Sequence, residues 1–247
     1  GYPIPNSFFR VKPRFIGQNF DVYVQKSFNL QLWNEGIDIN RRYVFLKQNE
    51  YDIITSVKVI SGSELIEYNN SQRLTIKYQA IMKLYDHNIC SHYDSEKIQN
   101  WMVYSNNVKI LDNPNSLPTR NNLLTIREVF SRLKPMLGKS INYVNAIQER
   151  NRGNELHKMI CYYLGYSVFQ DNGDYPDILN QLIEVKLQTS TTIDLGENSP
   201  LDNETLINVD GVSFSSQDVR YAIFRGIVIN NSSILLQNLY LVTGEDF

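Results

Sequence analysis

Residues 175–188, which read YPDILNQLIEVKLQ, decide the expected fold. The second half of this stretch alternates strictly between apolar residues (Ile183, Val185, Leu187) and polar residues (Glu184, Lys186, Gln188). A period of two predicts a strand with one buried face. The polar face then carries a carboxylate, an ammonium and an amide in one row, and the turn that starts at Pro176 is expected to bring Asp177 beside Glu184. Two carboxylates and a lysine at a strand end form a site for a hard divalent cation and an activated water.

A helix is expected immediately upstream of this strand. It is predicted to start near Ser140 and to run to Leu164. Its apolar side consists of Val144, Ile147, Leu156, Met159, Ile160 and Tyr163. Glu155 lies at the edge of that side, where its carboxylate is expected to overhang the sheet. A shorter helix is predicted over residues 124–133 and ends at Pro135.

The C-terminal part of the chain predicts a sheet. Residues 166–170 are expected to form a strand and residues 171–174 a turn, both before the alternating strand. A polar loop is expected from 189 to about 210, and residues 221–229 and 234–242 predict a hairpin. The expected fold class is therefore α/β (α+β), with a central mixed β-sheet flanked by helices.

The N-terminal half is expected to be a β-rich module. Segments rich in Val, Ile, Phe and Tyr alternate there with polar turns and cover residues 20–32, 42–48, 51–60 and 73–85. Turn-forming residues concentrate at 111–119 and predict a boundary, so we expect a β-rich N-terminal region over 1–118 and a core over 119–247. The aromatic and basic residues of the first 20 positions leave two alternatives. They form an arm along a phosphate backbone, or they pack their aromatic rings on the next domain.

The composition is that of an ordinary globular chain, with 42% apolar and 20% charged residues. The sequence contains no run of 18 or more apolar residues, and it does not open with a charged, apolar and small-residue leader. We therefore expect neither membrane insertion nor export. Because the sequence starts at Gly1 and not at a methionine, we expect it to be a fragment. Cys90 and Cys161 are too few for a disulfide framework and favour a reducing cytoplasm. The net charge of −2 argues against wholesale electrostatic capture of nucleic acid, but it is compatible with a basic groove beside an acidic metal site.

A second group of metal-binding residue types lies in the first half of the chain. His87, Cys90 and His92 are close in sequence. A structural zinc site needs four ligands, usually as two spaced pairs, and no second pair follows here. We therefore expect a surface loop at these residues.

The order of an acid on a helix (Glu155), Pro176–Asp177 at a turn and Glu184–Lys186 on a strand resembles the PD-(D/E)XK nuclease superfamily. Together with the chain length and the β-rich first half, this order is most similar to that of a type II restriction endonuclease. The motif resemblance covers about residues 145–190. It implies a restriction-endonuclease-like catalytic core over residues 119–247.

The resemblance also implies roles for individual residues. Asp177 and Glu184 are implied to bind Mg²⁺ with their carboxylates, and Val185 with its main-chain carbonyl. Lys186 is implied to position the attacking water and to favour its deprotonation. A cation close to the water supplies positive charge without binding the metal.

Two further residues have implied but less specific roles, and each assignment has a structural alternative. Glu155 is implied to complete the site, directly or through water, but it is also an ordinary surface charge on a helix. Gln188 is implied to hold Lys186 or to approach the scissile phosphate. Asp177 is also a common turn former, and Glu184 with Lys186 is also a common solvent-facing pair on an edge strand. The remaining acids nearby are Asp171 and Asp174, which are expected to shape the turn.

The implied function is a Mg²⁺-dependent, sequence-specific endonuclease of double-stranded DNA, of restriction type, that leaves 5′-phosphate ends. It is expected in the bacterial cytoplasm, as a homodimer and without a nucleotide cofactor. Residues 1–118 are expected to hold or recognise the DNA. The loop 189–218 is a second recognition candidate and carries Asn198, Asn203, Asn208 and Gln217. The alternatives are a DNA repair or junction-resolving nuclease with the same core, and a DNA-binding module with an inactive site.

Overall fold

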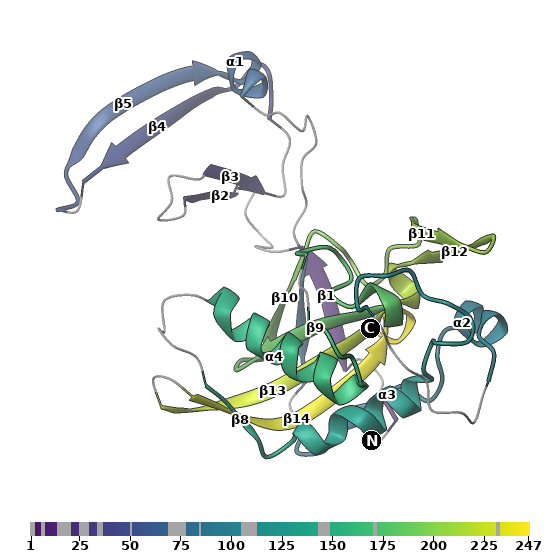
Figure 1. Cartoon of the computed structure of the whole chain (residues 1–247). Coiled ribbons are helices and arrows are strands. Elements are labelled where there is room, and N and C mark those ends of the chain that lie inside the picture. The colour runs from purple at the N-terminus through teal and green to yellow at the C-terminus, as the bar shows by residue number, and fades with distance from the viewer. Residues whose placement is uncertain are drawn as a thin grey trace. The chain divides into compact units, whose positions relative to one another are not determined.

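The computed structural model describes residues 3–5, 8–13, 21–24, 30–33, 37–49, 51–68, 78–83, 85–104, 113–142, 149–169, 172–230 and 233–247. The chain divides into two compact units (Figure 1). The larger unit consists of Gly1–Val11 and Gln79–Phe247, and the smaller unit is Lys12–Tyr78. No helix in the described ranges is long and apolar enough to cross a membrane.

The larger unit is built on a five-stranded mixed sheet. Its strands are β7 (Ile89–Cys90), β14 (Ser233–Thr243), β13 (Arg220–Asn230), β9 (Ile183–Gln188) and β8 (Ser140–Asn142). β13 and β14 form the predicted antiparallel hairpin, and β9 pairs with β13 in parallel. β14 also pairs in parallel with β7 and antiparallel with β8. The predicted mixed α and β architecture is confirmed at this level, and the strand order puts β9 next to the hairpin.

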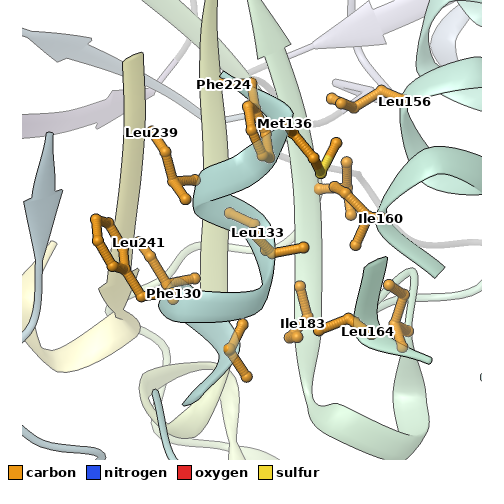
Figure 2. Close-up of a cluster of buried hydrophobic side chains, with 14 of the residues drawn as sticks. Phe130, Leu133, Met136, Leu156, Ile160, Leu164, Ile183, Phe224, Leu239 and Leu241 are labelled. Atoms are coloured by element: carbon orange, nitrogen blue, oxygen red, sulfur yellow. The ribbon is translucent and has the colours of Figure 1, made fainter. Parts of the chain in front are cut away.

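Two helices cover one face of this sheet. They are α3 (Ile126–Leu133), which continues into η1 (Lys134–Met136), and α4 (Glu149–Leu164). α3 begins at a capping box in which Thr125 and Glu128 satisfy each other's main-chain N–H groups. Figure 2 shows how the apolar residues meet; the helices contribute Phe130, Leu133, Leu156, Ile160 and Leu164, and the strands Ile183, Phe224, Leu239 and Leu241. Burial of each such side chain stabilises the fold by about 1.5–3 kcal/mol.

A three-stranded sheet packs on the other side. It consists of β1 (Phe9–Pro13), β6 (Tyr78–Met82) and β10 (Thr192–Gly196). Phe8 and Phe9 are buried, and their rings contact Tyr240 and Phe247. Tyr240 points away from the helices, because its neighbours Leu239 and Leu241 belong to the cluster on the helix face. Of the two alternatives for the N-terminal segment, packing of the aromatic rings is therefore the correct one for Phe8 and Phe9.

The expected polar loop after β9 contains regular structure instead. β10 comes first, and the hairpin β11 (Thr205–Val209) with β12 (Val212–Ser215) follows it. η3 (Ser216–Asp218) then leads into β13. One side of the hairpin is apolar and packs with α2 (Glu96–Trp101) through Phe214 and Trp101. The prediction of a loop was wrong because the apolar positions Ile207, Val209, Val212 and Phe214 lie between many polar residues.

The helix predicted from Ser140 to Leu164 starts later than expected. Residues 140–142 form β8, which pairs with β14, and α4 starts at Glu149. Val144 and Ile147, placed on its apolar side, lie outside the described residues. The helix ends as predicted at Gly165, whose φ of 103° suits glycine. In the expected strand over 166–170, Tyr166 forms an isolated bridge and residues 167–169 are not in a strand.

The smaller unit covers only part of the region 1–118 that was predicted to be β-rich, and its described residues are mostly strands. It contains β2 (Asp21–Val24) paired with β3 (Leu30–Trp33), β4 (Arg42–Gln48) paired with β5 (Ile54–Ser61), and α1 (Gly62–Glu67). Tyr43, Ile60 and Leu65 form its buried cluster. Gly62 is required where α1 begins, because a Cβ atom there would lie 1.8 Å from the Asp38 carbonyl oxygen.

A buried ion pair joins three parts of the larger unit. Arg220, at the start of β13, is fully buried, and its Nε donates to Asp94 Oδ1 at 2.7 Å. Asp94 Oδ2 accepts from the Ile126 N–H at 2.9 Å, at the first residue of α3. Arg220 Nη1 also donates to the Gln181 carbonyl at 3.1 Å, just before β9. The pair therefore fixes the start of α3 and the segment before β9 to β13.

Asp94→Asn is expected to destabilise the protein by about 3–5 kcal/mol, because it leaves the Arg220 charge buried and uncompensated. Urea unfolding followed by circular dichroism measures this change. The matched control is Asp210→Asn, since Asp210 forms an exposed ion pair with Arg120 at 3.8 Å. The control is expected to cost at most about 1 kcal/mol. Equal effects of the two substitutions would contradict the assigned role of Asp94.

Candidate active site

The site begins at a reversal of the chain just before β9. Ile178 and Ile183 form an isolated antiparallel bridge. Their main chains exchange two hydrogen bonds, of 2.9 Å from Ile178 N to Ile183 O and 3.1 Å in the other direction. η2 (Leu179–Gln181) spans the reversal, and Leu182 closes it with a left-handed φ of 51°. The reversal lays Asp177 alongside the first residues of β9.

Two buried amides hold this reversal in place. Gln181 accepts from Leu124 N–H through Oε1 and donates to the Asn122 carbonyl through Nε2, both at 2.9 Å. Asn180 donates to the Leu117 carbonyl at 3.2 Å and accepts from the Tyr166 hydroxyl at 3.0 Å. These bonds attach the reversal to residues 117–124 and to the segment after α4. This role is not predictable from the sequence, because Asn and Gln within a polar stretch are typical of exposed turns.

Two hydrogen bonds join Asp177 to the first residues of β9, one of them to Glu184. The Asp177 N–H donates to Glu184 Oε2 at 3.2 Å, and Asp177 Oδ2 accepts from the Val185 N–H at 2.8 Å. The expectation that the turn brings Asp177 beside Glu184 is therefore confirmed. An ionised carboxylate has about four acceptor positions, so a carboxylate that accepts such hydrogen bonds is also able to bind a cation.

The main-chain carbonyl of Val185 points towards Asp177. In a strand, the N–H and C=O of one residue point to the same side. The Leu182 carbonyl accepts from Arg220 N–H on β13 at 2.7 Å, whereas Ile183 exchanges its bonds with Ile178 on the opposite side. Val185 has the same orientation as Ile183, and its N–H is bonded to Asp177. Its carbonyl oxygen therefore lies at the same edge of β9 as the Asp177 carboxylate.

Glu184 and Lys186 form an ion pair on the face of β9 opposite the helices. Lys186 Nζ lies 2.8 Å from Glu184 Oε1, and the two side chains are 20% and 8% exposed. Burial lowers the pKa of Lys186, but its attraction to Glu184, its hydrogen bond to Glu184 and the charges of Asp177 and Asp194 outweigh burial. The pKa of Lys186 consequently stands above its ordinary value of 10.5, and the side chain is an ammonium at neutral pH. Asp194, on the neighbouring strand β10, was not singled out from the sequence.

Two tyrosines border Glu184. Tyr221 is its register partner on β13, and the Tyr221 hydroxyl is hydrogen-bonded to the Tyr175 hydroxyl. The pKa of Tyr175 is raised to about 12, chiefly by burial; the negative charge of Glu184 also raises it, and hydrogen bonds of the Tyr175 side chain lower it. Burial likewise raises the pKa of Tyr221 well above its ordinary value. The surroundings of Glu184 therefore exclude water on the side of the tyrosines, which strengthens its electrostatic interactions.

Glu155 and Gln188 are not drawn into these contacts. Glu155 is exposed on α4, the helix that packs on the face of β9 opposite the Glu184 side chain. Gln188 is half-buried at the end of β9, on the same face as Lys186. In the described part of the chain, no group of three or more His, Cys, Asp or Glu side chains is placed to hold a metal ion. The donors brought together here are the two carboxylates and the Val185 carbonyl.

The other candidate residues have structural surroundings. Cys90 lies buried in β7, so the expectation of a surface loop was wrong for this residue. Burial raises the pKa of the Cys90 thiol to about 11, which disfavours the thiolate that binds metals. His92 is exposed, and its Nδ1 lies 2.8 Å from Arg127 Nη2, within hydrogen-bond distance. Asp174 is exposed before the reversal, and Asp171 lies outside the described residues.

The four amides considered for DNA recognition are in different environments. Gln217 donates to the Leu201 carbonyl at 3.1 Å. Asn208 is exposed on β11 and contacts Ser213 across the hairpin at 3.4 Å. Asn203 is exposed and Asn198 half-buried. Their role in recognition remains a prediction.

Comparison with protein-family models, with curated proteins and with solved structures finds no match for this chain. The chemistry of the site therefore has to be argued from the residues themselves. The site consists of two carboxylates and a carbonyl at one strand edge, with a protonated lysine 2.8 Å from one of the carboxylates.

Glu184→Gln is expected to lower the pKa of Lys186 below that of the wild type, because burial then acts against a weaker attraction. NMR titration of labelled lysine side chains measures the change, and Glu204→Gln is the control at an exposed carboxylate. Because the folded-state pKa is raised, the stability from this ion pair is fully present below the pKa of an unfolded lysine. It is lost as the pH rises through the higher folded-state pKa. An unchanged Lys186 titration in Glu184→Gln would show that Glu184 does not hold the ammonium.

Proposed function

We propose that this protein is a Mg²⁺-dependent endonuclease of double-stranded DNA, of the restriction type within the PD-(D/E)XK superfamily. The observation that carries the proposal is the placement of Asp177, Glu184 and the Val185 carbonyl at one strand edge, with Lys186 next to Glu184. The separate parts of the motif are brought together by the reversal of the chain before β9. Such a spatial arrangement arises by chance less often than the sequence pattern alone.

The donor set fits a magnesium ion. Mg²⁺ prefers hard oxygen ligands, keeps several waters and is commonly bound through one or two carboxylates together with substrate phosphate oxygens. Asp177, Glu184 and the Val185 carbonyl would hold it. When bound, the ion supplies a bound water of lowered pKa and neutralises charge on the phosphate. A third protein carboxylate is not needed for such a site, so Glu155 is proposed only as a residue that acts through water.

Lys186 has a distinct task in this proposal. As an ammonium it cannot accept a proton, but its charge favours a hydroxide over a water nearby and stabilises negative charge that develops on the phosphate. Glu184 keeps the ammonium in place through their ion pair. The proposed reaction is attack of hydroxide on phosphorus and departure of the 3′ oxygen, which leaves a 5′-phosphate end.

The proposal extends to the partners of the protein. One such site cuts one strand, so two copies related by two-fold symmetry match the symmetry of duplex DNA. We propose a homodimer on this ground, which is analogy by class. We also propose that residues 1–118 and the hairpin β11–β12 contribute to holding or recognising the DNA.

The variants Asp177→Asn, Glu184→Gln and Lys186→Ala are expected to lower cleavage of phage DNA by at least about 10³-fold, since each removes a metal ligand or the stabilising charge. Asp174→Asn is the matched control, because Asp174 is an exposed acid outside the contacts of the site. DNA binding is measured in parallel with Ca²⁺ in place of Mg²⁺, and it should persist. Sequencing of the ends should give discrete positions with 5′-phosphates, and EDTA should abolish cutting.

Other outcomes separate the alternatives. Preferential cutting of branched over linear DNA identifies a junction-resolving or repair enzyme with the same core. DNA binding without cleavage under any divalent cation identifies a binding module. Normal cleavage by Asp177→Asn and Lys186→Ala shows that the site is elsewhere.

A further inference from the structure

The polar row of β9 continues across the neighbouring strands. Gln188 is in register with Arg225 on β13, and Arg225 is in register with Asn238 on β14. All three side chains lie on the face that carries Glu184 and Lys186, since their neighbours Leu187, Phe224 and Leu239 belong to the cluster on the helix face. By strand spacing and rise, the Cα of Arg225 is about 8 Å from that of Lys186.

Arg225 lies near the candidate site and carries a positive charge. The other cations near the site are paired, Lys186 with Glu184 and Arg220 with Asp94. Arg225, by contrast, forms no ion pair with any carboxylate in the described ranges. Arg225 is half-buried, and its positive charge lies close enough to the Tyr240 hydroxyl to lower the pKa of that group.

Tyr240 lies beside Arg225. The Tyr240 hydroxyl donates to the Tyr85 carbonyl at 3.0 Å, which holds the ring in place. Burial raises the pKa of Tyr240, and the positive charge of Arg225 lowers it. A guanidinium has five N–H donors, which suit an acceptor with several oxygens.

Asn238 is the neighbour of Arg225 on β14 and is buried. Its side chain is 4% exposed, and within the described residues its Oδ1 has no hydrogen-bond partner. An unpaired buried acceptor costs free energy, and an N–H or O–H donor would satisfy it. A β-bulge follows the Arg225–Asn238 pair, and bulges commonly redirect side chains beside active sites.

We propose that Arg225, together with Gln188, binds a backbone phosphate of the DNA next to the phosphate that is attacked beside Lys186. This inference rests on the proposed function. A planar guanidinium matches two phosphate oxygens at once, which an ammonium does not. Gln188 flanks Arg225 on the adjacent strand β9, and the N–H groups of its amide are donors suited to the same anion. Arg225 thus sets the register of the DNA strand on the site.

The test is Arg225→Gln, with DNA affinity measured in Ca²⁺ over a series of salt concentrations. The variant is expected to bind at least about tenfold more weakly, and the slope of log K against log salt concentration should fall by about 0.9, the value for one lost phosphate contact. Arg225→Lys should recover the slope but only part of the affinity. Lys134→Gln, at an exposed residue of η1 on the helix face, is the matched control and should leave both quantities unchanged.

The outcomes distinguish this inference from the proposed function. If Arg225 only supports Tyr240, Arg225→Gln lowers the melting temperature but leaves the salt slope unchanged, and the inference is overturned. If Arg225→Gln does not fold, the Arg225→Lys and Gln188→Ala variants decide, since unchanged affinity in both overturns the inference. If the wild-type protein cuts DNA but Arg225→Gln leaves the salt slope unchanged, only the inference about Arg225 is overturned. If the wild-type protein neither binds nor cuts DNA, both the proposed function and this inference are overturned.

Discussion

The two main-chain hydrogen bonds between Ile178 and Ile183 are the constraint on which the candidate site depends. They close the reversal that places Asp177 beside β9, and without them the carboxylates of Asp177 and Glu184 would be unrelated in space. The reversal is itself held by the buried amides of Asn180 and Gln181 and, through the Gln181 carbonyl, by Arg220. Buried polar side chains thus hold the reversal that positions the candidate site. Supporting hydrogen bonds of this kind generally keep the geometry of a functional site rigid.

β9 is the outermost strand of its sheet within the described structure, and this position explains how one strand serves both fold and chemistry. An outer strand presents unpaired main-chain groups, which proteins must cover or use. Here Ile178 takes the groups of Ile183, and Asp177 takes the N–H of Val185. Glu184 and Lys186 can therefore be a pair on an edge strand and also belong to the candidate site. Because β9 is the outer strand, the Val185 carbonyl lies outside the pairing of β9 with β13.

Local patterns were sufficient to predict some parts of this structure. The alternation from Ile183 to Gln188 predicted β9, and the two apolar runs around the turn at 230–232 predicted the hairpin. Both depend on side-chain period, which is visible in sequence. The start of α4 and the burial of Cys90 were not predictable, because they depend on pairing of β8 and β7 with the distant β14. The Arg220–Asp94 pair joins residues far apart in the chain, and no local pattern distinguishes a buried arginine from an exposed one.

The central claim is that Asp177, Glu184 and the Val185 carbonyl together hold a divalent cation. Diffraction from crystals of the wild-type protein soaked with Mn²⁺, recorded with anomalous signal, tests it most directly. The account predicts a peak within about 2.0–2.6 Å of oxygens from all three residues, the range for hard cations in proteins. A well-occupied peak elsewhere, or none at this edge at a Mn²⁺ concentration that supports DNA cleavage, would contradict it.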